Sequence, residues 1–381
     1  MPINYQQLQE FRKYLHKHPE ISGKEKETSR SVYNFIKNCN PISITKNIGG
    51  YGILATWDSF EKGQEILFRA ELDALPIKET NNFSHASVHT NVSHKCGHDG
   101  HSTILCGVAQ YLSDNIPLKG KIHLLFQPAE ENGKGAKAML SDKKLAHIKP
   151  DFVFALHNLP GYPLNQIVVR ENTFTAAVTS IIINLEGKTS HAAEPEKGIN
   201  PAIAVAQIIN ESLTKQIKDV ANEKMRIITP VYMKLGKKAY GISAGKATIH
   251  FTLRCWNDEN LYKLQQEIIE LSTKISKQQH LICSFSFTQT FSANINNKAA
   301  TDLVVKCAET NNFSIIKNPT PFKWGEDFGL FTSLYKGCMF GIGSGLNTPA
   351  LHNPDYDFPD ELLKTGVTIF KEIITNTNLK N

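Results

Sequence analysis

Hydrophobic residues recur along this chain with two spacings. One has the period of an amphipathic helix and predicts helices at residues 5–17, 26–38, 102–112, 298–309 and 361–375. The other consists of short apolar runs between polar residues, typical of buried strands, at residues 53–57, 66–68, 121–127, 152–156 and 339–342. Helices that alternate with buried strands predict an α/β domain.

From about residue 179 the order of elements changes. Strands are predicted near residues 181–183, 226–234, 246–254 and 282–287, with helices at 201–217 and 257–277. This order of strands and helices predicts a small α+β module of its own. We therefore expect a domain inserted into another, with a first catalytic segment over residues 1–177, an inserted domain over 178–288 and a second catalytic segment over 289–381.

The residues best suited to catalysis gather outside the inserted domain. Cys96 and His98 lie two positions apart, so a thiolate and an imidazole can bind one divalent cation. Glu130 and Glu131 are adjacent carboxylates, of which one can bind metal while the other transfers a proton. Two histidines in loop-like settings complete a set that would suffice for a hydrolytic centre with two ions. The set is Cys96, His98, Glu130, Glu131, His157 and His352.

Three predicted strands end beside such residues. The acids Glu71 and Asp73 follow one strand, the glutamate pair follows another, and His157 follows a third. Open α/β sheets collect their sites at the carboxyl ends of strands, so this repeated placement argues against coincidence. The stretch 96–101 is expected on the loop that enters a helix at Ser102, where the helix dipole favours a thiolate.

The residues alone leave other interpretations open. Cys96 and His98 are compatible with a closed structural zinc site, although nothing nearby completes its ligand set. Cys96 beside imidazoles would also suit a nucleophilic cysteine enzyme. His101 is an alternative ligand to His98, and the acids Glu326 and Asp327 either line the site or stabilise a loop.

Composition excludes several classes of function. The chain has 381 residues, 42 basic and 36 acidic side chains and a net charge of +6, without a dense basic block of the kind that binds nucleic acid. No apolar run approaches the roughly 18 residues of a membrane span, and the N-terminus lacks the apolar core of a signal peptide. Seven scattered cysteines do not suggest a disulfide framework. We expect a cytoplasmic protein.

Eight short stretches carry a resemblance to a known family. They are residues 15–20 (LHKHPE), 69–76 (RAELDALP), 96–101 (CGHDGH), 126–131 (FQPAEE), 155–158 (ALHN), 190–193 (SHAA), 325–328 (GEDF) and 351–354 (LHNP). Each is weak by itself, but eight in this order are specific, and they span nearly the whole chain. The chain resembles the M20 metallopeptidase family, and within it the amidohydrolase branch that acts on N-acyl amino acids.

The resemblance implies a catalytic α/β/α domain with a mostly parallel central sheet, and an inserted α+β lid that mediates dimerisation. It implies two divalent metal ions per subunit, with Zn or Mn as the leading candidates and Co or Ni as the others. A homodimer, or a higher assembly, is the implied oligomer. The positions that match the family's metal ligands are Cys96, His98, Glu131, His157 and His352.

Further roles follow from the same resemblance, position by position. Cys96 would bridge the two ions, and Glu130 would be the general base. His191, in the inserted domain, matches a residue that helps to stabilise the oxyanion from its own subunit or from a partner. Arg254 would bind the substrate carboxylate. The family usually has aspartate where this chain has Glu71, which leaves the effect on metal geometry open.

The implied reaction is hydrolysis of the amide bond of an N-acyl amino acid. An acetyl, benzoyl or similar acid and a free amino acid would be the products. One alternative is a dipeptidase or carboxypeptidase of the same family, and another is a homologue that binds such a ligand without catalysis. Activity that disappears on chelation would distinguish an enzyme from a binding protein.

Overall fold

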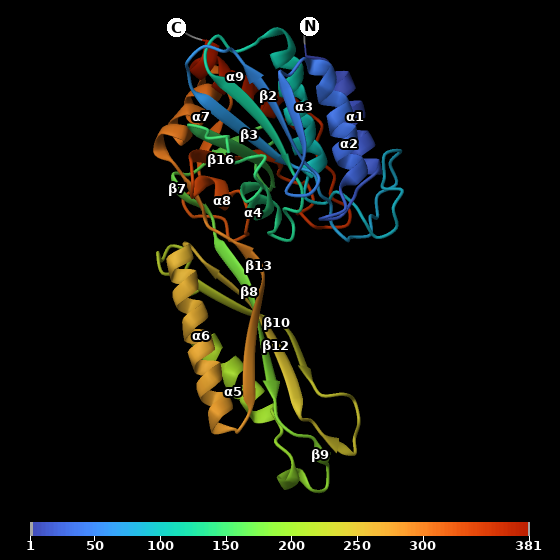
Figure 1. Ribbon diagram of the computed structural model, residues 1–381, viewed down its shortest axis with the longest axis vertical. Helices are drawn as coiled ribbons and strands as arrows, with labels where there is room; N and C mark the ends of the chain where they lie inside the picture. Colours follow the sequence, from blue (N-terminus) through green and yellow to red (C-terminus); the bar gives the residue numbers. More distant parts are fainter. Residues whose placement is uncertain (1–2, 380–381) are drawn as a thin grey trace. The chain divides into compact units, whose positions relative to one another are not determined.

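The computed structural model describes residues 3–379, and this part of the chain divides into two compact units (Figure 1). Unit 1 comprises the described residues up to Phe174, Asn294–Pro319, and the described residues from Glu326 onward. Unit 2 comprises Thr175–Ala293 and Thr320–Gly325. The domain boundaries expected after residues 177 and 288 fall just inside the long segment of unit 2.

A mixed sheet, eight-stranded within the described residues, forms the centre of unit 1. In spatial order its strands are β1 (Ser43–Ile48), β2 (Gly52–Asp58), β4 (Lys121–Gln127), β3 (Glu65–Glu71), β5 (Phe152–Pro160), β16 (Lys336–Gly345), β6 (Ile167–Val169) and β15 (Ile315–Lys317). The four neighbours β4, β3, β5 and β16 run parallel, which confirms the mostly parallel centre of the sheet. Their carboxyl ends therefore meet at one edge.

One face of this sheet is covered by long helices. These are α1 (Tyr5–Lys17), α2 (Lys26–Ile36, followed by a 3-10 turn at Lys37–Cys39), α3 (His98–Asp114), α7 (Lys298–Thr310) and α9 (Glu361–Ile374, followed by a π-helical turn at Thr375–Leu379). Every second side chain of β3, namely Ile66, Phe68 and Ala70, packs into the core that these helices share. Within residues 3–379, no helix combines the length and apolar character that a membrane span needs.

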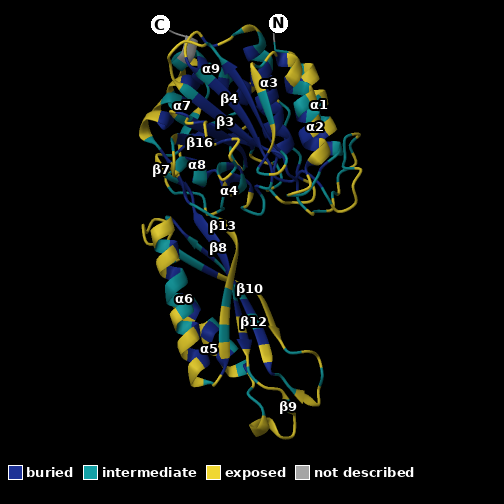
Figure 2. Ribbon diagram, in the orientation of Figure 1, coloured by how far each residue is buried: buried dark blue, intermediate teal, exposed yellow. Residues whose placement is uncertain are grey.

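The opposite face of the sheet is also covered, but by short helices. Arg69 points to this side, with its guanidinium 5.9 Å from the ring centroid of Phe328. Phe328 caps α8 (Gly329–Thr332), and α4 (Gly135–Leu140) packs against α8. Both faces of the central strands are thus buried (Figure 2), which explains their continuous apolar runs. Two further strands, β7 (Asn172–Thr175) and β14 (Asn294–Asn296), pair with each other.

Unit 2 is an antiparallel sheet with two helices on one face (Figure 1). Its strands, in spatial order, are β10 (Arg226–Leu235), β12 (Lys246–Cys255), β8 (Ala177–Glu186) and β13 (Ile282–Phe291). Helices α5 (Ala202–Leu213) and α6 (Asp258–Gln278) pack on the apolar side, where Ile249, Phe251 and Leu253 of β12 are buried. The short strands β9 (Ser190–His191) and β11 (Ile242–Ser243) pair with each other, and a 3-10 turn spans Pro195–Lys197. This is the predicted α+β module.

Three local predictions are wrong. Helix α3 begins at His98 instead of Ser102, because Gly97, with a φ of 96°, turns the chain directly into the helix. Strand β5 does not end before His157, and β16 does not end at residue 342 but continues to Gly345, because these extensions pair with each other in parallel register. Local apolar spacing could not show this pairing, since it involves glycines and a histidine.

Candidate metal centre

The candidate ligands come from the edge of the sheet where the four parallel strands end. Strand β3 ends at Glu71, the glutamate pair follows β4, His157 lies in β5, and His352 follows β16. The loop before α3 and the first residue of α3 bring the thiol and a further imidazole to the same place. The sequence-predicted set that unit 1 brings together is Cys96, His98, Glu130, Glu131, His157 and His352.

Two ligand groups share the thiol of Cys96. One group adds His98 and His157, the other adds Glu131 and His352, and within each group the ligand atoms lie within 4.8 Å of one another. The Sγ atom of Cys96 lies 3.6 Å from Nε2 of His157, and Oε2 of Glu131 lies 3.7 Å from Nε2 of His352. A thiolate that belongs to both groups is the arrangement expected when one sulfur bridges two ions.

The ring of His98 is oriented for metal binding. Its Nδ1 lies 2.9 Å from the backbone oxygen of Asp73 and 3.3 Å from the Asp73 carboxylate, so Nδ1 carries the proton and donates. The same carboxylate accepts hydrogen bonds from the Ser22 hydroxyl at 2.7 Å and from the Glu131 backbone at 3.0 Å. Support of this kind fixes the tautomer of a ligating histidine.

Two atoms that face the centre lack a hydrogen-bond partner within the described part of the chain. They are Nε2 of His98 and Oε1 of Glu131, both buried. A buried nitrogen and a buried carboxylate oxygen without hydrogen bonds are costly, and a cation would satisfy both. The donor set of sulfur, nitrogen and oxygen atoms therefore fits divalent metal ions.

Burial and neighbouring acids raise the pKa values of three groups in the centre. Burial raises the pKa of Glu131 to about 7, with Asp73 adding to the effect and His98 opposing it. Burial, together with Glu326 and Glu131, raises the pKa of Glu130 well above its usual value. Burial and the two glutamates raise the pKa of the Cys96 thiol. Bound cations would reverse these shifts by stabilising the deprotonated ligands.

The backbone before Glu130 is held in an unusual conformation. Ala129 has a φ of 54°, in the left-handed region that non-glycine residues rarely adopt. Its N–H donates to the carboxylate of buried Glu25 at 2.8 Å, which fixes this turn after β4. The turn places Oε2 of Glu130 3.9 Å from Nε2 of His98, beside the ligands.

His101 supports the centre instead of joining it. Its Nδ1 lies 2.7 Å from Glu71 and its Nε2 lies 2.5 Å from the side-chain oxygen of Asn158, so both ring nitrogens are occupied. This favours His98 as the ligand. Burial alone would raise the pKa of Glu71, but Arg69 and His101 lower it well below the usual range. Glu71, the departure from the family pattern, thus contacts the centre through His101.

Sequence reasoning missed the role of Arg69. This buried arginine pairs with Glu71, with Glu326 at 2.9 Å and with Asp327 at 2.6 Å, and it donates to Gln127 at 2.9 Å. Both acids whose role was open therefore bind Arg69, and their oxygens also lie within 4.8 Å of Glu130. A charged residue inside an apolar strand was the available signal, because such a group must find buried partners.

Two predicted site residues lie in unit 2. His191 is exposed in β9, where its Nδ1 accepts the Ala193 N–H at 3.1 Å. Arg254 lies on β12 and donates to the backbone oxygen of Lys323 at 2.6 Å, and burial lowers its pKa. Their roles in binding and catalysis stay predictions.

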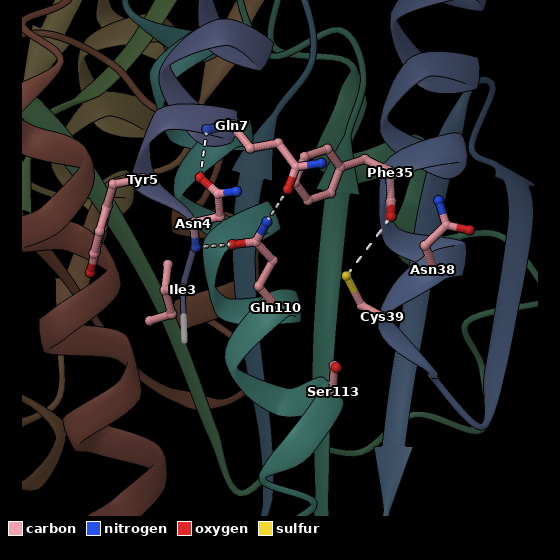
Figure 3. A pocket seen from close by; sticks show the side chains of 9 residues that line it. All are labelled: Ile3, Asn4, Tyr5, Gln7, Phe35, Asn38, Cys39, Gln110 and Ser113. Carbon is pink, nitrogen blue, oxygen red and sulfur yellow. Dashed lines mark hydrogen bonds between the residues drawn. The ribbon is translucent and has the colours of Figure 1, made fainter. Parts of the chain in front are cut away.

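A separate hollow of about 610 Å³ in unit 1 does not share this chemistry (Figure 3). It lies between α1, α2 and the far end of α3, where Gln110 is roughly 18 Å along the helix from His98. Asn4, Gln7 and Gln110 hydrogen-bond one another across it. Burial raises the pKa of the Cys39 thiol there to about 11. Its described lining contains no carboxylate or imidazole.

Comparison with known proteins identifies the family of the chain. The chain matches the sequence profile described as Peptidase family M20/M25/M40 over residues 67–376, and it belongs to this family. Membership makes it a metal-dependent amide hydrolase, and it sets aside the structural zinc site and the cysteine nucleophile.

Its relatives include deacetylases. An N-acetyl-L-cysteine deacetylase of Bacillus subtilis (strain 168) is 32% identical over 90% of this chain and 82% of its own length. An N-acetyldiaminopimelate deacetylase of Lactobacillus helveticus (strain DPC 4571) is 29% identical over 97% of each. A dinuclear metal-binding M20 peptidase of Bacillus subtilis has the same fold, with a TM-score of 0.83, 24% identity and 98% coverage of both chains.

Proposed function

We propose that this enzyme hydrolyses N-acyl amino acids with two divalent metal ions. Cys96 would bridge the ions, His98 and His157 would complete one site, and Glu131 and His352 would complete the other. The observation that carries the proposal is the pair of ligand groups that share Cys96, with Glu130 beside them. The acyl-amino-acid class is supported by the two deacetylase relatives.

The bound metal would supply an activated water and polarise the amide carbonyl. Glu130 is the residue placed to take the proton of the attacking water and to return it to the leaving nitrogen. The Glu25–Ala129 hydrogen bond holds the turn that aims this carboxylate.

Two residues of unit 2 would contribute to substrate recognition in the same proposal. Arg254 is a cation suited to the carboxylate of the amino-acid half of the substrate. His191 would stabilise the oxyanion that forms at the acyl carbon. Its side chain is exposed, and Nδ1 accepts the local N–H of Ala193, so its Nε2 points to no described hydrogen-bond partner and is available for this role.

The substrate class can be tested by amino-acid release. The chelated enzyme would be assayed with and without added Zn or Mn against acetyl, benzoyl and longer acyl amino acids and against dipeptides. We expect release from acyl amino acids that depends on added metal, with acetyl substrates preferred. Release from dipeptides alone would instead establish a dipeptidase. Ligand binding that survives chelation, without release, would indicate a homologue that has lost catalysis.

We also propose a homodimer that pairs through the edge strand β10. Val231, Tyr232 and Met233 of this strand are 55%, 50% and 65% exposed, which is unusual for large apolar side chains on a sheet edge. A hollow of about 400 Å³ between β10 and α5 continues this apolar surface. Sedimentation should show a particle of twice the 42.5 kDa chain mass. Introducing Met233→Lys should yield monomers, and a wild-type monomer would refute the proposal.

For location we propose the cytoplasm. Six of the seven cysteines are free thiols, namely Cys39, Cys96, Cys106, Cys255, Cys283 and Cys338. Free thiols are typical of a reducing compartment, in which a metal-binding thiolate such as that of Cys96 persists.

A further inference from the structure

A buried lysine precedes the bridging cysteine. Lys95 has no exposed surface, and its Nζ donates to Oε1 of Glu79 at 2.5 Å and to the backbone oxygen of Tyr356 at 2.7 Å. Its own backbone oxygen accepts the N–H of His352 at 2.7 Å. One residue therefore holds the ligand-bearing segment 352–356 at two points, and it is covalently attached to Cys96.

The conformation of His352 explains why such support is needed. His352 has a φ of 67°, in the left-handed region, and its side chain is 52% exposed, so packing does little to hold it. A non-glycine residue keeps this conformation only where its surroundings impose it. The hydrogen bond from its N–H to Lys95 is the direct restraint.

The partner of Lys95 is itself firmly held. Glu79 also accepts the Ser87 N–H at 2.6 Å and lies 3.0 Å from Nε2 of buried His16. The neighbours of Glu79 add two contacts to the same ligand-bearing segment, from Thr80 N–H to the oxygen of Pro354 and from the Asn81 side chain to the oxygen of Asp355, both at 3.1 Å. The Lys95 ammonium is thus held in one position relative to segment 352–356.

We propose that Lys95 is a positioning residue that sets the geometry of the Cys96–Glu131–His352 ligand group, and with it the affinity for one of the two ions. The inference rests on the proposed two-ion function. In the second ligand group, His98 and His157 come from α3 and β5, whereas the described hydrogen bonds of the Lys95 ammonium go to Glu79 and Tyr356. Loss of the ammonium should therefore affect the two ions unequally.

The test is a titration of the metal-free full-length chain with Co²⁺. Calorimetry would measure the affinities, and the absorption of Co²⁺–thiolate bonds would report binding at Cys96. Wild type should bind two ions. Lys95→Met should keep one ion within a few-fold of its wild-type affinity and weaken the other by about 10- to 100-fold, the range found for residues that support metal ligands. Lys78→Met is the matched control, because Lys78 is an exposed lysine directly before Glu79, and the variant should bind ions as wild type does.

A second variant separates positioning from stability. Lys95→Met leaves Glu79 with Ser87 and His16 but without its lysine, and Glu79→Gln/Lys95→Met removes the charge that the lysine balanced. The double variant should recover thermal stability, yet the second ion should stay weak because the contact to Tyr356 is still missing. The inference would be overturned if the double variant recovered both thermal stability and the affinity for the second ion. It would also be overturned if Lys95→Met bound two ions with wild-type affinity. A wild-type chain that binds fewer than two ions would overturn the proposed function instead.

Discussion

Glu130→Ala should leave both ions bound and lower kcat by about 100-fold or more. The carboxylate stands beside the ligands, 3.9 Å from Nε2 of His98, but it belongs to neither group that shares Cys96. Its removal takes away the proton acceptor for the attacking water without removing one of the five proposed ligands. The measurement is kcat on the best acyl amino acid, with metal content determined by elemental analysis on the same sample.

Glu131→Ala is the matched control for this experiment, since it removes the neighbouring carboxylate. It should lose one ion, because Glu131 belongs to the group with Cys96 and His352. Opposite effects of two adjacent glutamates would establish the division between proton transfer and metal binding. Near-wild-type kcat in Glu130→Ala would refute the role of general base. Loss of an ion from Glu130→Ala would make Glu130 a ligand, which its position near His98 and Glu131 permits.

Cys96→Ser should weaken the binding of both ions, by a larger total factor than any other single substitution of a ligand. The reason is geometric, because Cys96 is the member common to both ligand groups. His157→Ala and His352→Ala should each weaken one ion. Calorimetric titration of the metal-free variants with Zn²⁺ would measure the affinities and the stoichiometry.

Cys106→Ala provides the control for the loss of a buried thiol. Cys106 lies in α3 and packs in the helical core, away from the ligand groups. Its substitution should cost some stability through a small cavity, on the order of 1 kcal/mol or more, and should leave two ions bound. If Cys96→Ser kept one ion at wild-type affinity, the thiolate would belong to a single site and would not be a bridge.

The sequence by itself determined the elements and the chemistry. Helical spacing predicted α1 at residues 5–17, where it is found, because one apolar face is a local property of the chain. The sequence also showed the candidate chemistry without any fold. It contains two adjacent glutamates, and a thiol two residues from an imidazole. The eight ordered stretches carried the resemblance to the family to which the chain belongs.

Only the tertiary structure decided which of these residues act together. The residues alone left His101 as an alternative to His98, and only the resemblance favoured His98. In the structure, Nε2 of His98 has no hydrogen-bond partner among the described residues, whereas both ring nitrogens of His101 are occupied. The pairing of Cys96 with His352 depends on a hydrogen bond between segments far apart in the chain. The buried acids that pair with Arg69 could not be predicted from the sequence either. Spacing records only what lies nearby along the chain, whereas ligand geometry depends on parallel strands that bring distant residues to one edge.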